Sequence, residues 1–313
     1  MKLFMKDLSR IKIAVLKGGF SRERKVSLRT GAAAAAALRL VGCRVEEVDV
    51  RSRRLRLPEG IDVVFIALHG AYGEDGELQE VLERRGIPFT GSGSKACRRA
   101  LDKAQAKECF RKAGLAVPDG IVLRGRDASP LAGDLPFGLP AVVKPAREGS
   151  SIGVRIVRKE SEISAAVRAA RRSDRVVLVE KYIPGRELTV GVLGNIALPA
   201  IEIRPKGGWY DYTNKYTAGN TEYLVPAPIS RDLERRVRKL GLRAHRALGC
   251  RDMSRADFRL DEGGGIYLLE VNTIPGMTET SLLPKAAAAA GVPFPKLCLR
   301  LVEGALRRGK EKP

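Results

Sequence analysis

Two segments near the C-terminal end of the sequence carry three side chains of the kind that bind hard cations. Asp257 lies in RADFRL, and Glu270 and Asn272 lie in YLLEVN. Alternate side chains of a strand share a face, so Glu270 and Asn272 point the same way, with Asp257 opposite them on the neighbouring strand. Magnesium takes a few carboxylate ligands together with substrate phosphates. The pattern predicts a magnesium site on a strand pair, and a hairpin that binds no cation is the simpler alternative.

A glycine- and serine-rich turn in VVKPAREGSSIGV has the residue types that bind phosphate. Gly149 and Gly153 let backbone amides approach phosphate oxygens, Ser150 and Ser151 add hydroxyl donors, and Lys144 adds a positive charge. The Walker pattern GxxxxGK[ST] is absent, which argues against a P-loop nucleotide-binding protein. Taken alone, such a turn is an ordinary hairpin about as often as it is a phosphate site.

A third group of polar residues lies in VVLVEKYIPGREL, where two carboxylates flank a turn. Glu180 could contact the edge of an adenine ring, and Glu187 could contact a ribose diol. A charged surface turn is the alternative. Together with the glycine- and serine-rich turn and the acidic strand pair, these residues favour a nucleotide site.

The elements that must position these residues begin with an open parallel sheet. Residues 11–19 predict a buried strand, residues 26–42 a helix, and residues 44–50 and 62–70 two further strands. This order is typical of a parallel sheet with its functional loops at the C-terminal ends of the strands. The α/β unit is predicted to span residues 1–102.

Two smaller α+β units are predicted to follow, over residues 103–186 and 187–313. The first should hold a helix from residue 103, a helix at 160–172, and strands at 120–123, 140–144, 153–157 and 176–185. The second should hold strands at 187–193 and 196–203, a helix at 231–248, the strand pair with the acidic residues, and helices after Pro284 and Pro295. The long polar loop at 204–222 is predicted to be a lid.

Composition excludes some classes of protein. The 313 residues contain 44% hydrophobic residues, which suits a globular protein, and no apolar stretch approaches the length of a membrane span. Without a signal peptide, the chain is expected in the cytoplasm. The net charge of +21 raises nucleic-acid binding as an alternative, but only 5% of residues are aromatic and none alternates with the basic runs. We therefore predict no nucleic-acid partner.

Eight motifs in order resemble the D-alanine:D-alanine ligase family of the ATP-grasp superfamily. They are GGFSRERKVSLRTG, LHGAYGEDG, GSGSKACRRALDK, KPAREGSSIGV, EKYIPGRELTV, YDYTNKY, RADF and LLEVNTIPGMTETSLLP. The resemblance spans nearly the whole chain. It implies an N-terminal parallel-sheet domain followed by a two-part α+β ATP-grasp module. It also implies ATP-dependent joining of two D-alanines through an acyl phosphate, as a step in making peptidoglycan precursors.

The resemblance also implies site residues, a cofactor and an assembly. ATP should bind Lys103, Lys144, Ser151, Glu180, Lys181, Ile183, Glu187 and Lys215, and two Mg²⁺ (or Mn²⁺) should bind Asp257, Glu270 and Asn272. Catalytic roles fall to Glu23, Ser150, Tyr216, Arg255 and Gly276, and substrate binding to Glu23, His69, Ser281 and Leu282. The partners are D-alanine and ATP, and the family pattern implies a homodimer.

Several of these roles have plainer alternatives. Arg255 could be a simple ion-pair partner of Asp257, His69 a structural histidine, and the Ser281 hydroxyl a helix N-cap. The sequence departs from the family pattern at Lys25, where the family commonly has an acidic residue, and at Tyr182, which is often tryptophan. A D-alanine:D-lactate ligase, or another ATP-grasp ligase that joins a carboxylate to an amine, remains the nearest alternative activity.

Overall fold

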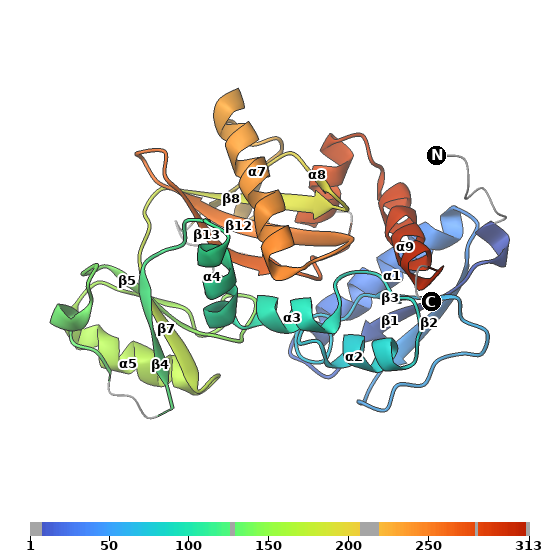
Figure 1. The fold of residues 1–313 in the computed structure, drawn as a ribbon, viewed down its shortest axis with the longest axis horizontal. Coiled ribbons are helices and arrows are strands. Elements are labelled where there is room, and N and C mark those ends of the chain that lie inside the picture. The colour runs from blue at the N-terminus through green and yellow to red at the C-terminus, as the bar shows by residue number, and fades with distance from the viewer. Residues whose placement is uncertain (1–7, 126–128, 207–218, 279–280, 311–313) are drawn as a thin grey trace.

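A computed structural model describes residues 8–125, 129–206, 219–278 and 281–310. Three sheets lie along the long axis of the molecule, with helices packed on them (Figure 1). Each sheet is built from one part of the chain, in the order expected for a parallel-sheet domain followed by two α+β parts. The predicted fold class is therefore confirmed.

The first sheet is parallel, with strand order β2-β1-β3. The elements of this part are β1 (Lys12–Gly18), α1 (Arg24–Leu40), β2 (Arg44–Val50), β3 (Val63–Ile66), α2 (Glu77–Arg84) and α3 (Ser94–Leu101), after a short 3₁₀ turn at Leu8–Arg10. All four residues of β3 are buried, as expected for a strand covered on both faces. The loops after β1 and β3 carry Glu23 and His69 to the same end of the sheet.

The second sheet is antiparallel, with strand order β4-β7-β5-β6. Its elements are α4 (Lys103–Lys112), β4 (Gly120–Arg124), a 3₁₀ turn (Ala132–Asp134), β5 (Ala141–Pro145), β6 (Arg155–Val157), α5 (Glu160–Arg171) and β7 (Val176–Lys181). Helix α5 packs on this sheet through Ile163, Ala166, Val167 and Ala170, which recur at helical spacing. The sheet carries Lys144 on β5 and Glu180 on β7.

The third sheet contains the acidic strand pair. Its main path is β11-β10-β8-β12-β13, with β9 paired to β8. The elements are β8 (Arg186–Leu193), β9 (Ile196–Ala197), β10 (Ile201–Pro205), β11 (Thr221–Leu224), α7 (Arg231–Leu248), β12 (Met253–Leu260), β13 (Ile266–Asn272), α8 (Leu282–Ala289) and α9 (Phe294–Lys310). Helix α7 packs on β8 and β12, and α8 packs on β8.

Several boundaries differ from the sequence-based expectation, and proline explains three of the differences. The strand expected at 196–203 is split into β9 and β10, with Pro199 between them, because proline has no amide hydrogen for the ladder. Helices α8 and α9 begin before Pro284 and Pro295 rather than after them. Both prolines lie in a first helical turn, where the missing amide hydrogen has no intrahelical partner.

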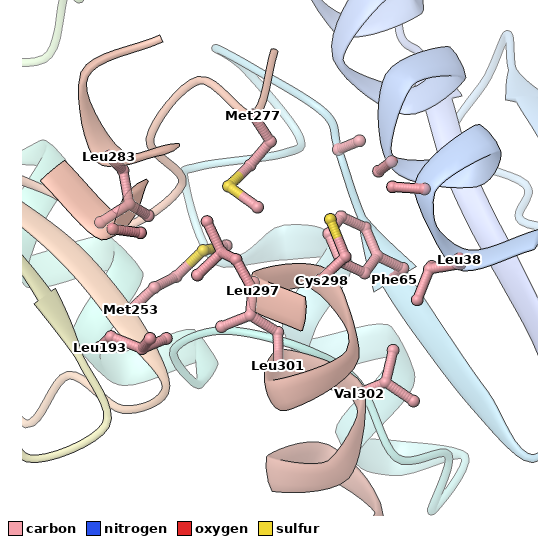
Figure 2. Packing of buried hydrophobic residues seen from close by; sticks show 14 of the residues in the cluster. Leu38, Phe65, Leu193, Met253, Met277, Leu283, Leu297, Cys298, Leu301 and Val302 are labelled. Atoms are coloured by element: carbon pink, nitrogen blue, oxygen red, sulfur yellow. The ribbon is translucent and has the colours of Figure 1, made fainter. Parts of the chain in front are cut away.

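The C-terminal helix α9 returns to the N-terminal part of the molecule. It packs against α1, β3 and α8. Figure 2 shows Leu301 and Val302 of α9 near Phe65 and Leu38, in a cluster that also includes Met253 of β12. This shared core joins the parallel sheet to the third sheet and so fixes the cleft between them. In the part of the chain that the structure describes, no helix is both long and apolar enough to cross a membrane.

Candidate active site

Two adjoining cavities lie where the three parts of the molecule meet. The larger, of about 460 Å³, is lined by residues of the N-terminal part and the third sheet, among them Glu23, His69, Arg255, Asn272 and Ser281. The second is lined by residues of the second and third sheets, among them Lys144, Glu180, Ile183, Glu187 and Asp257. Lys103, Glu148, Gly149 and Glu270 line both cavities. A group held in one cavity can therefore reach a group held in the other past Lys103 and Glu270.

The acidic strand pair has the register that the sequence predicts. Asp257 on β12 lies opposite Glu270 on β13, and Arg255 lies opposite Asn272. Residues that pair across an antiparallel ladder share a face, so these four side chains lie together. Both carboxylates are paired with cations. Arg255 donates two hydrogen bonds to Asp257, at 2.9 and 2.8 Å, and Lys103 Nζ lies 3.2 Å from Glu270 Oε2.

The donor set suits magnesium better than a metal bound wholly by protein. Among the described residues, no three His, Cys, Asp or Glu side chains are placed to hold one ion. Two carboxylates and the amide of Asn272 are hard oxygen donors, and magnesium commonly completes its shell with phosphate oxygens and water. Asn272 Oδ1 accepts a hydrogen bond from the Ile274 amide at 2.8 Å, which fixes the orientation of the side chain. The residues present therefore fit Mg²⁺ or Mn²⁺.

Lys103 is placed by the start of helix α4. The Asp102 side chain caps this helix by accepting hydrogen bonds from the amides of Ala104 and Gln105, each at 3.1 Å. The buried Lys103 ammonium donates to the Glu148 carbonyl at 2.7 Å, in addition to its ion pair with Glu270. Its charge thus lies at the boundary between the cavities.

The second cavity contains a buried carboxylate with two cations. Glu180 Oε2 lies 2.9 Å from Lys144 Nζ, and Glu180 Oε1 lies 3.0 Å from Lys107 Nζ. Burial alone would raise the pKa of Glu180, but the two lysines hold it below its ordinary value. Glu180 is therefore ionised at neutral pH.

The other predicted nucleotide residues surround this carboxylate. Lys181, Ile183 and Glu187 all line the second cavity. Arg259 holds this turn by donating to the Ile183 carbonyl at 3.1 Å, and its guanidinium lies 3.6 Å from the Glu187 carboxylate. The positions form a cavity wall with an acidic residue at each end.

The glycine- and serine-rich turn reaches across to the N-terminal domain. Ser150 and Ser151 have φ angles of 53° and 58°, in the left-handed region. Ser150 Oγ donates a hydrogen bond of 2.5 Å to Glu23 Oε1, at the start of α1. Ser151 lines the second cavity, whereas Ser150 and Glu23 line the first. The turn therefore contributes to both cavities.

His69 lies in a buried polar network at the wall of the first cavity. Its Nε2 lies 3.1 Å from Thr30 Oγ1 and its Nδ1 lies 3.4 Å from Glu74 Oε1. Burial raises the pKa of Glu74, although His69 counteracts part of this effect. The ring is held on both sides, which suits a structural histidine, and it also lines the cavity, which suits a substrate contact.

Gly276, Ser281 and Leu282 lie together at the start of α8 and line the first cavity. Ser281 occupies the N-cap position, but its hydroxyl makes no capping hydrogen bond. Ser281 Oγ instead accepts a hydrogen bond from the Thr278 amide at 3.2 Å and lies 2.7 Å from Thr278 Oγ1. A Cβ added at Gly276 would lie 2.8 Å from Ser281 Oγ, so a larger residue there would turn the Ser281 hydroxyl away from its present position.

Some predicted residues lie outside the described part of the chain. Lys215 and Tyr216, and most of the predicted lid, fall in residues 207–218, which the structure does not describe. The two ends of the predicted loop are ordered as strands β10 and β11, which pair antiparallel from Glu202↔Leu224 to Pro205↔Thr221.

Sequence reasoning missed residues that the structure places around the site. Lys107 follows Lys103 by four residues, so helical spacing alone would have placed both on one face of α4. Arg259 follows Asp257 by two residues in a strand, which is again a same-face spacing. Glu74 carried no such signal, because it lies in an irregular segment.

Comparison with known proteins agrees with this geometry. The family model described as D-ala D-ala ligase C-terminus matches residues 110–303, and the one described as D-ala D-ala ligase N-terminus matches residues 42–92. The D-alanine–D-alanine ligase of Anaeromyxobacter dehalogenans is 50% identical over 298 residues, which cover 94% of this chain and 96% of that protein. That of Syntrophotalea carbinolica is 49% identical over 304 residues, which cover 96% and 98%.

Solved structures give the same result. The crystal structure of D-alanine–D-alanine ligase from Bacillus anthracis complexed with ATP matches with a TM-score of 0.85 and 33% identity. This match covers 97% of this chain and 100% of that chain. A second structure of the Bacillus anthracis enzyme matches with a TM-score of 0.87 and 35% identity. From these matches and the two adjoining cavities, we conclude that the chain belongs to the D-alanine–D-alanine ligase family.

Proposed function

We propose that the chain joins two D-alanine molecules to D-alanyl-D-alanine, with ATP converted to ADP and phosphate. The observation that carries this proposal is the shared wall between the cavities, where Lys103 and Glu270 line both. ATP bound in the second cavity would direct its γ-phosphate past this wall. The carboxylate of a D-alanine in the first cavity would then attack it to form an acyl phosphate.

Phosphoryl transfer needs placed positive charge more than covalent help. Lys103 supplies charge at the boundary between the cavities, and Lys144 supplies it inside the nucleotide cavity. We assign Glu180, Lys181, Ile183, Glu187 and Ser151 to nucleotide binding because all five line that cavity. Lys215, which lies outside the described residues, is proposed as a further ATP-binding cation on the family resemblance alone.

We assign Asp257, Glu270 and Asn272 to two Mg²⁺ or Mn²⁺ ions. When bound, these ions would neutralise charge on the phosphates of ATP. Arg255 donates hydrogen bonds of 2.9 and 2.8 Å to Asp257, so a metal ion bound at Asp257 would compete with Arg255. Displaced from Asp257, the guanidinium would turn toward the first cavity, which Arg255 also lines.

The second step is attack of the amine of the second D-alanine on the acyl phosphate. This attack builds negative charge on the former carbonyl oxygen, and a placed donor stabilises such an oxyanion. Arg255 and the backbone amide of Gly276 are the proposed donors, and both residues line the first cavity. Closure against water would protect the acyl phosphate from hydrolysis.

The two D-alanines are assigned to opposite walls of the first cavity. The Glu23 carboxylate, held by Ser150, would bind the ammonium of the first, with His69 near its carboxylate. Ser281 and the Leu282 amide at the start of α8 would bind the carboxylate of the second, because free amides at a helix N-terminus favour anions. Tyr216, outside the described residues, is proposed to join the Ser150–Glu23 pair.

Three further assignments concern the domains, the assembly and the location of the protein. The division into 1–102, 103–186 and 187–313 is supported by one sheet in each range, apart from Arg186, the first residue of β8. A homodimer and a cytoplasmic location are likewise proposed. Gel filtration with light scattering tests the assembly.

The activity is tested by phosphate release from ATP with a panel of D- and L-amino acids. We expect release that requires both D-alanine and Mg²⁺, with D-alanyl-D-alanine as the product. Equal phosphate release with L-alanine would contradict the proposal. The products formed from a mixture of D-alanine and D-lactate distinguish this activity from that of a D-alanine:D-lactate ligase. The ester-forming enzyme would yield the depsipeptide.

A further inference from the structure

Lys107 is a buried lysine beside the nucleotide cavity. It lies on α4, and its side chain is 3% exposed. The Glu180 carboxylate is its only ion-pair partner among the described residues, at 3.0 Å, and neither atom of this contact makes a hydrogen bond of good geometry. Glu180 lines the nucleotide cavity, whereas Lys107 lines neither cavity. Lys107 therefore has no direct contact with a nucleotide in that cavity, and its nearest route to one is through Glu180.

The fold gains little from this lysine at neutral pH. Burial lowers the pKa of Lys107 to about 8, against the opposing effect of Glu180. The pKa of Lys107 is thus lower in the folded chain than in the unfolded chain. Below pH 8 the protonated lysine therefore lowers the free energy of unfolding, and this destabilisation decreases as the pH rises above 8. Lys144 alone would already pair with Glu180. A second buried cation on one carboxylate thus needs a reason other than stability.

A second cation beside Glu180 is needed when Lys144 exchanges Glu180 for a phosphate of the nucleotide. Lys144 lines the nucleotide cavity and can turn from Glu180 to a phosphate. Without Lys107, Glu180 would then be a buried carboxylate with no cation beside it, and such a group tends to take up a proton. Lys107 cannot reach the nucleotide, so its charge stays with Glu180.

We propose that Lys107 is a positioning residue, which keeps Glu180 ionised and directed into the cavity while Lys144 binds the nucleotide. An ionised carboxylate only accepts hydrogen bonds. It attracts the exocyclic amino group of adenine and repels a carbonyl at the same position of the ring. Lys107 thereby contributes to the choice of purine. This inference rests on the proposed ATP-dependent function.

Gly120 on the neighbouring strand leaves the space that this arrangement needs. Gly120 pairs with Glu180 across β4 and β7. A Cβ added at Gly120 would lie 2.9 Å from Glu180 Cγ, so any larger residue would displace the carboxylate stem. The direction of Glu180 is thus set by Gly120 on one side and by the lysines at its oxygens.

The test compares binding of two nucleotides, measured by calorimetry with Mg²⁺ and without D-alanine. One is ATP, and the other is purine riboside triphosphate, which lacks the 6-amino group. For Lys107→Met we expect ATP affinity to fall about tenfold, since a hydrogen bond to a charged group is lost, and the affinity of the analogue to change by less than about threefold. Lys107→Arg keeps the charge and should keep most of the preference. Lys112→Met, an exposed lysine of the same helix, is the matched control.

A merely structural role predicts a different result. Lys107→Met would then lower the unfolding temperature and weaken binding of both nucleotides equally, whereas we expect no fall in the unfolding temperature at pH 7. An unchanged ratio of the two affinities in Lys107→Met, or in Lys107→Gln where the methionine variant does not fold, overturns the inference. Failure of the wild-type chain to bind ATP at all would instead contradict the proposed function.

Discussion

The two carboxylate clusters of the cleft differ in how far they are closed to solvent. Glu180 is 3% exposed and lies between two buried lysines. Glu270 is 33% exposed at the boundary between the cavities, where it pairs with Lys103, and its neighbour Asp257 pairs with Arg255. In both clusters each carboxylate is paired with a cation. Glu270 of the second cluster is exposed enough to meet an incoming metal, whereas Asp257, at 9% exposed, must first exchange its pair with Arg255.

This difference separates recognition from reaction. The buried cluster keeps its charge and direction, so it suits selection of the nucleotide base. The open cluster must exchange its ion pairs for metal and phosphate, so it suits stabilisation of charge that develops in the transition state. Changes in the open cluster should therefore lower kcat, whereas changes in the buried cluster should weaken nucleotide binding.

Glu270→Gln should have the largest effect. The carboxylate is a proposed metal ligand, and its loss should lower kcat by on the order of a thousandfold at saturating ATP and Mg²⁺. Glu262→Gln, at an exposed position in the turn of the same hairpin, is the control and should be neutral. A kcat within about threefold of the wild type would show that Glu270 is not an essential metal ligand. The two carboxylate clusters would then not differ in role as we infer.

Arg255→Ala should cost somewhat less. Loss of an oxyanion donor lowers kcat by about 10²- to 10³-fold, or about 3 to 4 kcal/mol in the barrier. If Arg255 only paired with Asp257, its removal would free that carboxylate, and the main change would be in the Mg²⁺ concentration needed for half-maximal rate. Rates over a Mg²⁺ titration decide between these results, and Arg246→Ala on the exposed side of α7 serves as the control.

The pH dependence of ATP binding should report the buried cluster. Three charged groups influence Lys107: Glu180 raises its pKa, and Lys144 and Arg111 lower it. Movement of Lys144 toward phosphate should raise that pKa from about 8, so ATP binding takes up a proton above pH 8. Affinity should fall about fivefold from pH 8 to 9. The same fall in Lys107→Arg would show that another group titrates.

Ser150→Ala should have the smallest effect. It removes the hydrogen bond to Glu23, worth about 1 kcal/mol, without touching either carboxylate cluster. We expect about a fivefold rise in the KM for the first D-alanine, with little change in the KM for ATP. Steady-state kinetics with each substrate varied in turn measure both constants, and a larger change for ATP would contradict the assignment of Ser150 to the first cavity.

The alternation of side chains along strands allowed the acidic strand pair to be predicted from the sequence. Alternation along two strands predicted that Asp257, Glu270 and Asn272 share one face, and the observed register has Asp257 opposite Glu270. The three-part fold was likewise predictable, because buried strands and helices recur with clear turns between them. These are local patterns, and a single sequence contains them in full.

Long-range partners were harder to predict. The apolar residues of α9 indicate a buried face but not what covers it, and only the structure shows that the helix packs on α1 and β3. Helical spacing from Lys103 indicates the face of α4 on which Lys107 lies, but not its partner Glu180, which lies 73 residues further along the chain, on β7. The break between β9 and β10 lies at Pro199. The apolar residues of this segment predicted one continuous strand, so the break was not predicted.

The central claim is that phosphate passes from the nucleotide cavity to a D-alanine carboxylate in the neighbouring cavity. It is tested most directly with D-alanine labelled with ¹⁸O in its carboxylate. Formation of an acyl phosphate followed by attack of the amine leaves one carboxylate oxygen on the phosphate that is released. Mass spectrometry should therefore find one ¹⁸O in each inorganic phosphate formed with the dipeptide. Phosphate without ¹⁸O would show that the carboxylate does not attack ATP, and it would contradict the account.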